Sequence, residues 1–122
     1  MVCNCQNAQN NNVIEFIKGT TMICTFNFNE DISSYTSAEF VIRKDYNTEP
    51  VIDIEVTEIQ EKSLTVELSP EQTNLFTEFQ NGQNSSKYIW GLDLIDSVNN
   101  LRINVFPQTG NSAPLCIVYK HV

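Results

Sequence analysis

The sequence predicts an all-β protein, an antiparallel β-sandwich with one short helix in a connection between strands. Three observations lead to this prediction. Apolar and polar residues alternate with a two-residue period in one segment after another, as they do in half-buried strands. Turn-forming residues separate these segments at short, regular intervals, which is typical of sandwiches and barrels. The alternation stops once, between Ser69 and Gly82, where helix signals take its place.

The segment Tyr88–Asp96 is the strand around which we expect the sheets to be built. One face of this segment carries four large apolar side chains, Tyr88, Trp90, Leu92 and Leu94. Trp90 is the single tryptophan of the chain, and a side chain of this size contributes strongly to a small core. On the opposite face, Asp93 is expected to form a structural ion pair with Arg43 or Arg102 across the sheet.

Length and composition indicate one domain. The chain has 122 residues, of which 41% are hydrophobic, and this is enough to build a core. Residues 1–12 are rich in Asn and show no periodicity, so we expect a flexible polar tail there. Residues 13–122 are expected to form the sandwich domain.

Five strands are expected before the helix. Thr20–Phe28 shows the pattern most clearly, because its apolar side chains share one face while threonine and asparagine occupy the other. The loops between strands are rich in Asp, Asn, Ser and Pro. The five expected strands are Val13–Ile17, Thr20–Phe28, Ser37–Lys44, Val51–Thr57 and Ser63–Leu68.

The helix is expected to begin at Ser69. This residue is a good N-cap, Pro70 suits the first helical position, and Gln72 completes a capping box. The apolar residues that follow, Leu75, Phe76 and Phe79, predict one amphipathic face that closes an open end of the sandwich. Asn81-Gly82 is expected to end the helix.

Two strands are expected after the central one. Residues 97–100 form a hairpin turn that leads into Leu101–Phe106, with Leu101, Ile103 and Val105 facing the core. The last strand, Leu115–Lys120, is apolar on both faces, so it is either deeply inserted or covered by a neighbouring chain. We therefore expect interaction residues in this strand, at Leu115, Ile117, Val118 and Tyr119.

Charge and hydropathy narrow the choice of partners. The chain has 15 acidic and 7 basic residues, for a net charge of −8, so phosphate backbones and anionic lipid surfaces repel it. We therefore expect neither nucleic-acid nor membrane binding. The sequence contains no apolar run of about 18 residues that would predict a membrane span, and the first residues lack the features of a secretory signal.

Residues that could carry catalysis or bind a metal are few. His121 is the single histidine and lies next to the end of the chain, so no Ser-His-Asp or Cys-His arrangement is expected. Cys3 and Cys5 would supply only half of a zinc site. The four cysteines, Cys3, Cys5, Cys24 and Cys116, are expected to be free thiols made in a reducing cytoplasm, with interchain disulfides of Cys3 and Cys5 after release as the alternative. Cys3 and Cys5 are further interaction candidates. No catalytic residue, cofactor or metal site is predicted, and the chain is not expected to be an enzyme.

Four stretches together suggest a family: Lys18-Gly19-Thr20 after the first strand, Phe40–Lys44 before Pro50–Ile52, Leu68–Thr73 (LSPEQT) before the helix, and the aromatic strand that ends at Asp96 with its hairpin mate. In this order they resemble the immunoglobulin-like domain at the N-terminus of phage baseplate upper proteins and in related small phage structural proteins. LSPEQT is the most specific part. The resemblance covers residues 13–106, whereas the N-terminal tail and the last strand depart from the family pattern.

The resemblance implies a non-enzymatic virion protein, an accessory capsid module (head decoration or fibre anchor) or a baseplate module, made in the host bacterial cytoplasm. Its partners would be other virion proteins or further copies of itself, bound by strand addition through the last strand or the tail. Two alternatives remain. A carbohydrate-binding or host-adhesion module would use exposed aromatic residues, for which Tyr35, Tyr46, Phe106 and Tyr119 are candidates. An acidic inhibitor that mimics nucleic acid is disfavoured because the acidic residues are dispersed.

Overall fold

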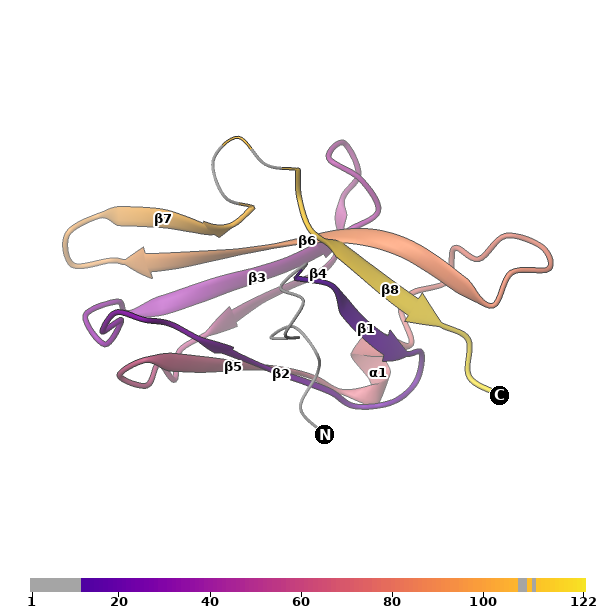
Figure 1. The fold of residues 1–122 in the computed structure, drawn as a ribbon, viewed down its shortest axis with the longest axis horizontal. Coiled ribbons are helices and arrows are strands. Elements are labelled where there is room, and N and C mark those ends of the chain that lie inside the picture. Colours follow the sequence, from indigo (N-terminus) through magenta and orange to yellow (C-terminus); the bar gives the residue numbers. More distant parts are fainter. Residues whose placement is uncertain (1–11, 108–109, 111) are drawn as a thin grey trace.

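The computed structural model describes residues 12–107, 110 and 112–122 (Figure 1). These residues form a mostly β structure with one short helix. The expected tail therefore lies, except for Asn12, outside the described residues. The elements are β1 (Ile14–Ile17), β2 (Met22–Asn27), β3 (Ser37–Arg43), β4 (Pro50–Val56), β5 (Ser63–Leu68), α1 (Pro70–Thr73), β6 (Ser85–Asp96), β7 (Leu101–Phe106) and β8 (Leu115–Tyr119).

The strands form two open sheets. The larger sheet has the order β1-β8-β6-β3-β4, and β7 also pairs with β6. The smaller sheet consists of β2 and β5. The prediction of a purely antiparallel fold is wrong at one place, because β1 and β8 run parallel. Parallel pairing joins strands that are far apart in sequence, and no local pattern distinguishes it from antiparallel pairing.

The expected central strand is confirmed as β6, which is twelve residues long. One edge of β6 pairs with β3. The opposite edge is shared end to end by β8, which pairs with Ser85–Ile89, and by β7, which pairs with Leu92–Asp96. The strand therefore joins every other strand of the larger sheet directly or through one neighbour.

The two sheets share one hydrophobic core, an arrangement consistent with a β-sandwich. Phe26 of the smaller sheet packs against Trp90 and Phe40 of the larger one, with ring centroids 5.5 and 6.3 Å apart. The indole Nε1 of Trp90 donates to the carbonyl oxygens of Asn12 (3.0 Å) and Leu115 (3.1 Å). The polar group of this buried side chain is thus satisfied by segments at the two ends of the described chain.

The helix begins as expected and ends much earlier. Ser69 and Gln72 form the predicted capping box around Pro70, but α1 stops at Thr73 after one turn, so the prediction of a helix up to Asn81 is wrong. The Nζ of Lys18 donates to the carbonyl oxygens of Asn74 (2.6 Å) and Phe76 (2.9 Å). A longer helix would use the Asn74 carbonyl for its own N–H four residues later.

The residues of the expected helical face have separate roles. Leu75 is 56% exposed, whereas Phe76 is fully buried. The Phe76 ring meets Phe16 at 5.2 Å and Tyr88 at 4.8 Å between centroids, in edge-to-face geometry in both cases. Phe76 therefore provides the core contact that was predicted for the helix, from an irregular segment.

A buried hydroxyl joins α1 to the turn between β1 and β2. The Oγ1 of Thr73, which is fully buried, donates to the Thr20 carbonyl oxygen (2.7 Å) and accepts from the Gly19 N–H (3.0 Å). Gly19 has φ +81°, a left-handed conformation that glycine adopts without strain. The segments around Lys18 and Thr73 are thus held together by several hydrogen bonds.

The placement of β7 differs from the prediction. Leu101 and Ile103 were expected to face the core, but they are 52% and 43% exposed. Ile103 pairs with the buried Leu94, so it does point to the core side of the sheet. Phe106, at the other end of β7, is the residue that meets the smaller sheet, with its ring centroid 6.0 Å from that of Phe26 in β2.

We predict that Thr73→Val destabilises the protein by about 2 kcal/mol, because the Gly19 N–H and the Thr20 carbonyl lose their shared partner at a buried site. Urea unfolding followed by circular dichroism measures this. Thr65→Val is the matched control, since the Thr65 hydroxyl meets Thr25 at the exposed surface, and its cost is expected to stay below about 0.5 kcal/mol. Equal costs for the two variants would show that the Thr73 hydroxyl has no special role.

Candidate functional site

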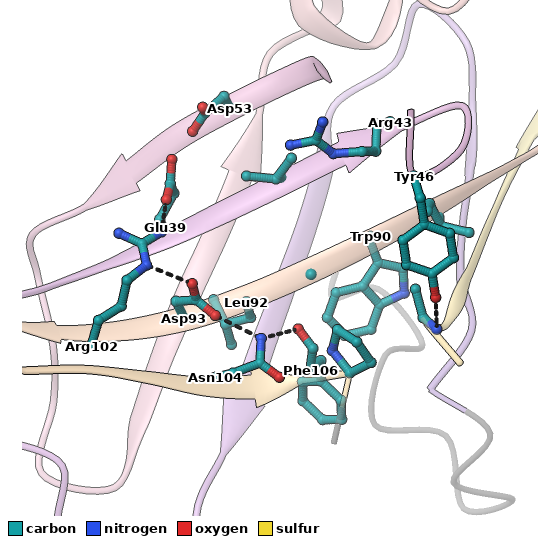
Figure 2. A pocket seen from close by; sticks show the side chains of 15 residues that line it. Glu39, Arg43, Tyr46, Asp53, Trp90, Leu92, Asp93, Arg102, Asn104 and Phe106 are labelled. Atoms are coloured by element: carbon teal, nitrogen blue, oxygen red, sulfur yellow. Dashed lines mark hydrogen bonds and ion pairs between the residues drawn. The ribbon is translucent and has the colours of Figure 1, made fainter. Parts of the chain in front are cut away.

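A hollow of about 250 Å³ lies on the outer face of the larger sheet (Figure 2). It is formed by side chains from β3, β4, β6 and β7, together with Tyr46, Pro107 and Ala113 from the connecting loops. Its floor is charged, because consecutive strands place polar residues on the same face of the sheet. Glu39 lies opposite Asp93, and Asp93 lies opposite Asn104.

Arg102 is the centre of this polar network. Its Nε donates to Asp93 Oδ2 at 2.8 Å, and its Nη2 donates to the carboxylate of Glu39 (Figure 2). Asn104 Nδ2 donates to Asp93 Oδ1 (2.7 Å) and to the Phe106 carbonyl oxygen (3.0 Å). The expected pair between Asp93 and Arg102 is confirmed. Arg43, the other candidate partner, donates instead to the Thr48 carbonyl oxygen (2.8 Å).

Two carboxyl groups at the edge of the network have pKa values that are shifted in opposite directions. Asp53 and Glu39 point toward each other (Figure 2). The hydrogen bond between them, followed by burial and the repulsion of the Glu39 charge, raises the pKa of Asp53. The same hydrogen bond, followed by the one from Arg102, lowers the pKa of Glu39. Split carboxyl pKa values occur in catalytic pairs, but ion-pair networks between strands produce them as well.

The aromatic residues at the hollow have different environments. Tyr46 is 64% exposed, and its hydroxyl oxygen accepts a hydrogen bond from the Ala113 N–H (2.7 Å). The ring of Phe106 packs into the core, with its centroid 4.9 Å from that of Trp90. Gly91 permits this placement, since a Cβ at residue 91 would approach the Phe106 carbonyl oxygen to 3.1 Å. Of these two candidates for sugar stacking, Tyr46 alone presents an open ring.

The other two aromatic candidates are also engaged. Tyr35 packs against the hydrophobic core. The hydroxyl of Tyr119 donates to Glu15 Oε1 (2.7 Å), and this hydrogen bond is the main cause that raises the pKa of Tyr119. The four aromatic residues named from the sequence therefore do not share one surface.

The interaction residues expected in the last strand lie in β8, which is inserted between β1 and β6. Both of its edges are paired within the chain, so the expectation that β8 adds to a neighbour's sheet is wrong for this arrangement. Val118 is fully buried, whereas Leu115 is 39% exposed and Ile117 and Tyr119 are partly buried. Binding of a partner through the outward side chains stays a prediction.

The cysteines differ from one another. Cys3 and Cys5 lie outside the described residues. Cys24 is disulfide-bonded, so the expectation of free thiols is wrong at this residue. Cys116 is free and buried, and burial raises the pKa of its thiol far above the usual range.

The remaining features considered from the sequence are His121, a metal site and a membrane-spanning helix. His121 is exposed, with Nδ1 2.8 Å from the Val122 carbonyl oxygen. Within the described ranges, no three His, Cys, Asp or Glu side chains come together as a metal site would require. The single helix of those ranges, α1, has four residues and is too short to cross a membrane.

A second surface was missed from the sequence. We call it the β7 surface, and it consists of Val98, Leu101 and Ile103, which are 82%, 52% and 43% exposed. These residues follow one another on the β6–β7 hairpin (Figure 1). Leu101 and Ile103 alternate with polar residues as in a buried strand, so their burial could not be judged without knowing which strand lies below.

No family model, curated protein or solved structure matches the chain.

We predict that Arg102→Gln lowers the free energy of unfolding by about 1 kcal/mol at pH 7, because it leaves neighbouring carboxylates unpaired on a partly exposed surface. The lowered pKa of Glu39 gives the sign of the pH dependence. The Glu39 carboxylate stabilises the fold at pH values above its unfolded-state pKa, and this contribution is lost as pH falls through its folded-state pKa. The difference between wild type and variant should therefore shrink below about pH 4, as measured by urea unfolding across pH.

Asp53→Asn is expected to change the stability at pH 7 in the opposite direction to Arg102→Gln. The raised pKa of Asp53 means that its contribution to stability is fully present below its unfolded-state pKa and lost as pH rises through the folded-state pKa. An amide keeps a hydrogen-bond donor toward Glu39 at every pH, so the variant should be more stable than wild type at pH 7 and equal to it in acid. Glu67→Gln, on the smaller sheet, is the control and should show neither effect.

Removal of residues 115–122 is expected to abolish cooperative unfolding, because it exposes an edge of β6 and deprives β1 of its sheet partner. A folded, monomeric truncation product with a native near-UV spectrum would contradict this prediction and would restore β8 as a docking strand.

Proposed function

We propose that this chain is an immunoglobulin-like structural protein of a phage virion, an accessory capsid or baseplate module that acts by binding other proteins and not by catalysis. One observation carries the proposal: β7 is an edge strand with exposed apolar side chains. Leu101 and Ile103 project from its core-side face, and Val98 lies at the hairpin tip with 82% of its surface exposed.

An edge strand of this kind normally carries protection against association. Natural sheets protect edges with unpaired lysines, prolines, bulges or a covering segment. The strand Leu101–Phe106 contains no proline, and its one charged residue, Arg102, is already paired with Asp93 and Glu39. A register shift at Val105 bulges the end of the strand, whereas the segment around Leu101 and Ile103 pairs regularly with β6. The β7 surface therefore fits a contact site that a partner covers during assembly.

The order of strands supports the immunoglobulin-like part of the proposal. In immunoglobulin sandwiches, the second and fifth lettered strands (B and E) belong to one sheet, while C, F and G form the other and C′ extends it in variable-type domains. Here β2 and β5 form one sheet, and β4, β3, β6 and β8 follow one another in the other. The hairpin of β6 with β7 is an addition to this plan.

The residues that carry the family resemblance also meet in space. Lys18 and Gly19 bond to the chain at and just after Thr73, and the Thr73 hydroxyl bonds back to Thr20. A shared structural role explains why these two distant stretches occur together. This supports kinship with the phage family, from which the virion role is inferred.

A carbohydrate-binding role has weaker support. Sugar rings are commonly held by exposed aromatic faces together with polar side chains. The hollow contains the exposed ring of Tyr46. However, its carboxylates Asp93 and Glu39 already accept hydrogen bonds from Arg102 and Asn104.

The direct test is mass spectrometry of purified particles of the phage whose genome encodes this chain. We expect the protein in the particles, and we expect Ile103→Lys to reduce its incorporation at least about tenfold, which corresponds to about 1.4 kcal/mol of binding energy. Leu75→Lys is the matched control, since Leu75 is 56% exposed and lies outside β7. Circular dichroism establishes that both variants fold. Absence of the wild-type chain from the particles would refute the proposed function.

A further inference from the structure

Cys24 is disulfide-bonded, and its partner can be inferred by elimination. The chain has four cysteines, and Cys116 is free, which leaves Cys3 and Cys5. We propose that Cys24 is joined to Cys3 or Cys5, and that this bond fastens the N-terminal segment to β2 when the protein passes from a reducing into an oxidising medium. The bond is independent of the proposed virion role.

The side chain of Cys24 faces the core of the sandwich. It is fully buried on the same face of β2 as Met22 and Phe26, opposite Val66 of β5. The two sulfur atoms of a disulfide are about 2 Å apart, so the partner sulfur must enter between the sheets. Cys116 is also buried, and burial raises the pKa of its thiol far above the usual range. Little of the thiolate that disulfide exchange requires is therefore formed at Cys116.

The described chain begins close to Cys24. The carbonyl oxygen of Asn12 accepts a hydrogen bond from Trp90 Nε1 (3.0 Å), and the ring centroids of Trp90 and Phe26 are 5.5 Å apart. Phe26 and Cys24 are successive residues on one face of β2, about 7 Å apart along the strand. Cys5 precedes Asn12 by seven residues, and seven extended residues span up to about 23 Å. Chain length therefore permits the bond from Cys5, and more easily from the cysteine two residues earlier.

The disulfide links the two sheets through the chain. The loop that it closes spans about 20 residues and includes all of β1. β1 belongs to the larger sheet, whereas Cys24 belongs to the smaller one. In the described ranges β1 pairs with a single strand, β8. The bond therefore stabilises the folded state by restricting the unfolded chain around a strand that has one sheet partner.

Formation of the bond is an oxidation that removes one hydrogen from each of two thiols. A small disulfide such as oxidised glutathione accepts the two electrons. The thiolate of one cysteine attacks it and releases one glutathione thiolate, and the thiolate of the second cysteine then attacks the mixed disulfide and releases the other. The two protons lost by the cysteine thiols are taken up by the released glutathione thiolates. Because disulfides persist in oxidising media and not in the cytoplasm, the bonded form belongs to protein that has left the reducing cytoplasm.

Peptide mapping of the wild-type full chain, without reductant, tests the pairing. Trypsin, which cleaves after Lys and Arg, places the two N-terminal cysteines in residues 1–18, Cys24 in residues 19–43 and Cys116 in residues 103–120. After incubation with oxidised glutathione, we expect peptides 1–18 and 19–43 to be linked in the monomer of 13.9 kDa. A peptide 19–43 that is unlinked, that is bound to peptide 103–120, or that is linked to peptide 1–18 in dimers alone would overturn the inference.

The state inside the producing cell is measured by blocking thiols with N-ethylmaleimide before lysis. We expect peptides 1–18 and 19–43 then to be separate and alkylated, because the bond has not formed in the reducing cytoplasm. Peptides that are already linked at this stage would contradict the dependence on the medium.

Thermal unfolding gives a second measurement of the pairing. The oxidised wild-type protein is expected to have a Tm about 10 °C above that of the reduced protein. This difference should disappear in the double variant Cys3→Ser/Cys5→Ser. It should persist in Cys116→Ala, the matched control, because Cys116 is free. A difference that survives in the double variant, or that is lost in Cys116→Ala, would refute the proposed pairing.

Discussion

The alternation of side chains along β6 is the constraint on which the rest of the structure depends. Tyr88, Trp90, Leu92 and Leu94 enter the core on one face, while Asp93 stands on the other at the floor of the hollow. Because the period is two, a slip of one residue would expose the aromatic rings and bury Asp93. The core and the charged network are therefore specified by the same register. The neighbours β3, β8 and β7 must each match it.

The two faces of β7 differ in their contacts: the outer face is bonded to neighbouring strands, and the core-side face carries the proposed contact surface. Its outer side chains, Arg102 and Asn104, belong to the network that joins β7 to β6 and β3. Of its core-side residues, Leu101 and Ile103 remain exposed, whereas Phe106 packs against Phe26 of the smaller sheet. Hydrogen bonds thus hold the hairpin at its turn and on its outer face, while Leu101 and Ile103 stay exposed. The ion pairs thus fix the position of the strand that carries the proposed contact surface.

Local features of this chain could be predicted from the sequence, and features that depend on distant contacts could not. The capping box at Ser69 and the pair of Asp93 with Arg102 follow from spacing along one or two neighbouring strands. Just after the early end of α1, the carbonyl oxygens of Asn74 and Phe76 accept hydrogen bonds from Lys18, more than fifty residues away. The exposure of Ile103 depends on the extent of the smaller sheet, which has two strands in the described ranges. The place of Asp53 beside Glu39 depends on the β3–β4 pairing register, which an apolar pattern alone does not determine.

The parallel pair of β1 and β8 also has a consequence for synthesis on the ribosome. Ile14 pairs with Cys116, so about a hundred further residues must be synthesised before β1 can pair with β8. Until then, the nascent chain presents Ile14 and Phe16, which end up buried, and the open edge of β6. Closure of the larger sheet is thus a late event that follows translation of β8. A partly synthesised chain that exposes apolar strands and an unpaired sheet edge is prone to aggregation.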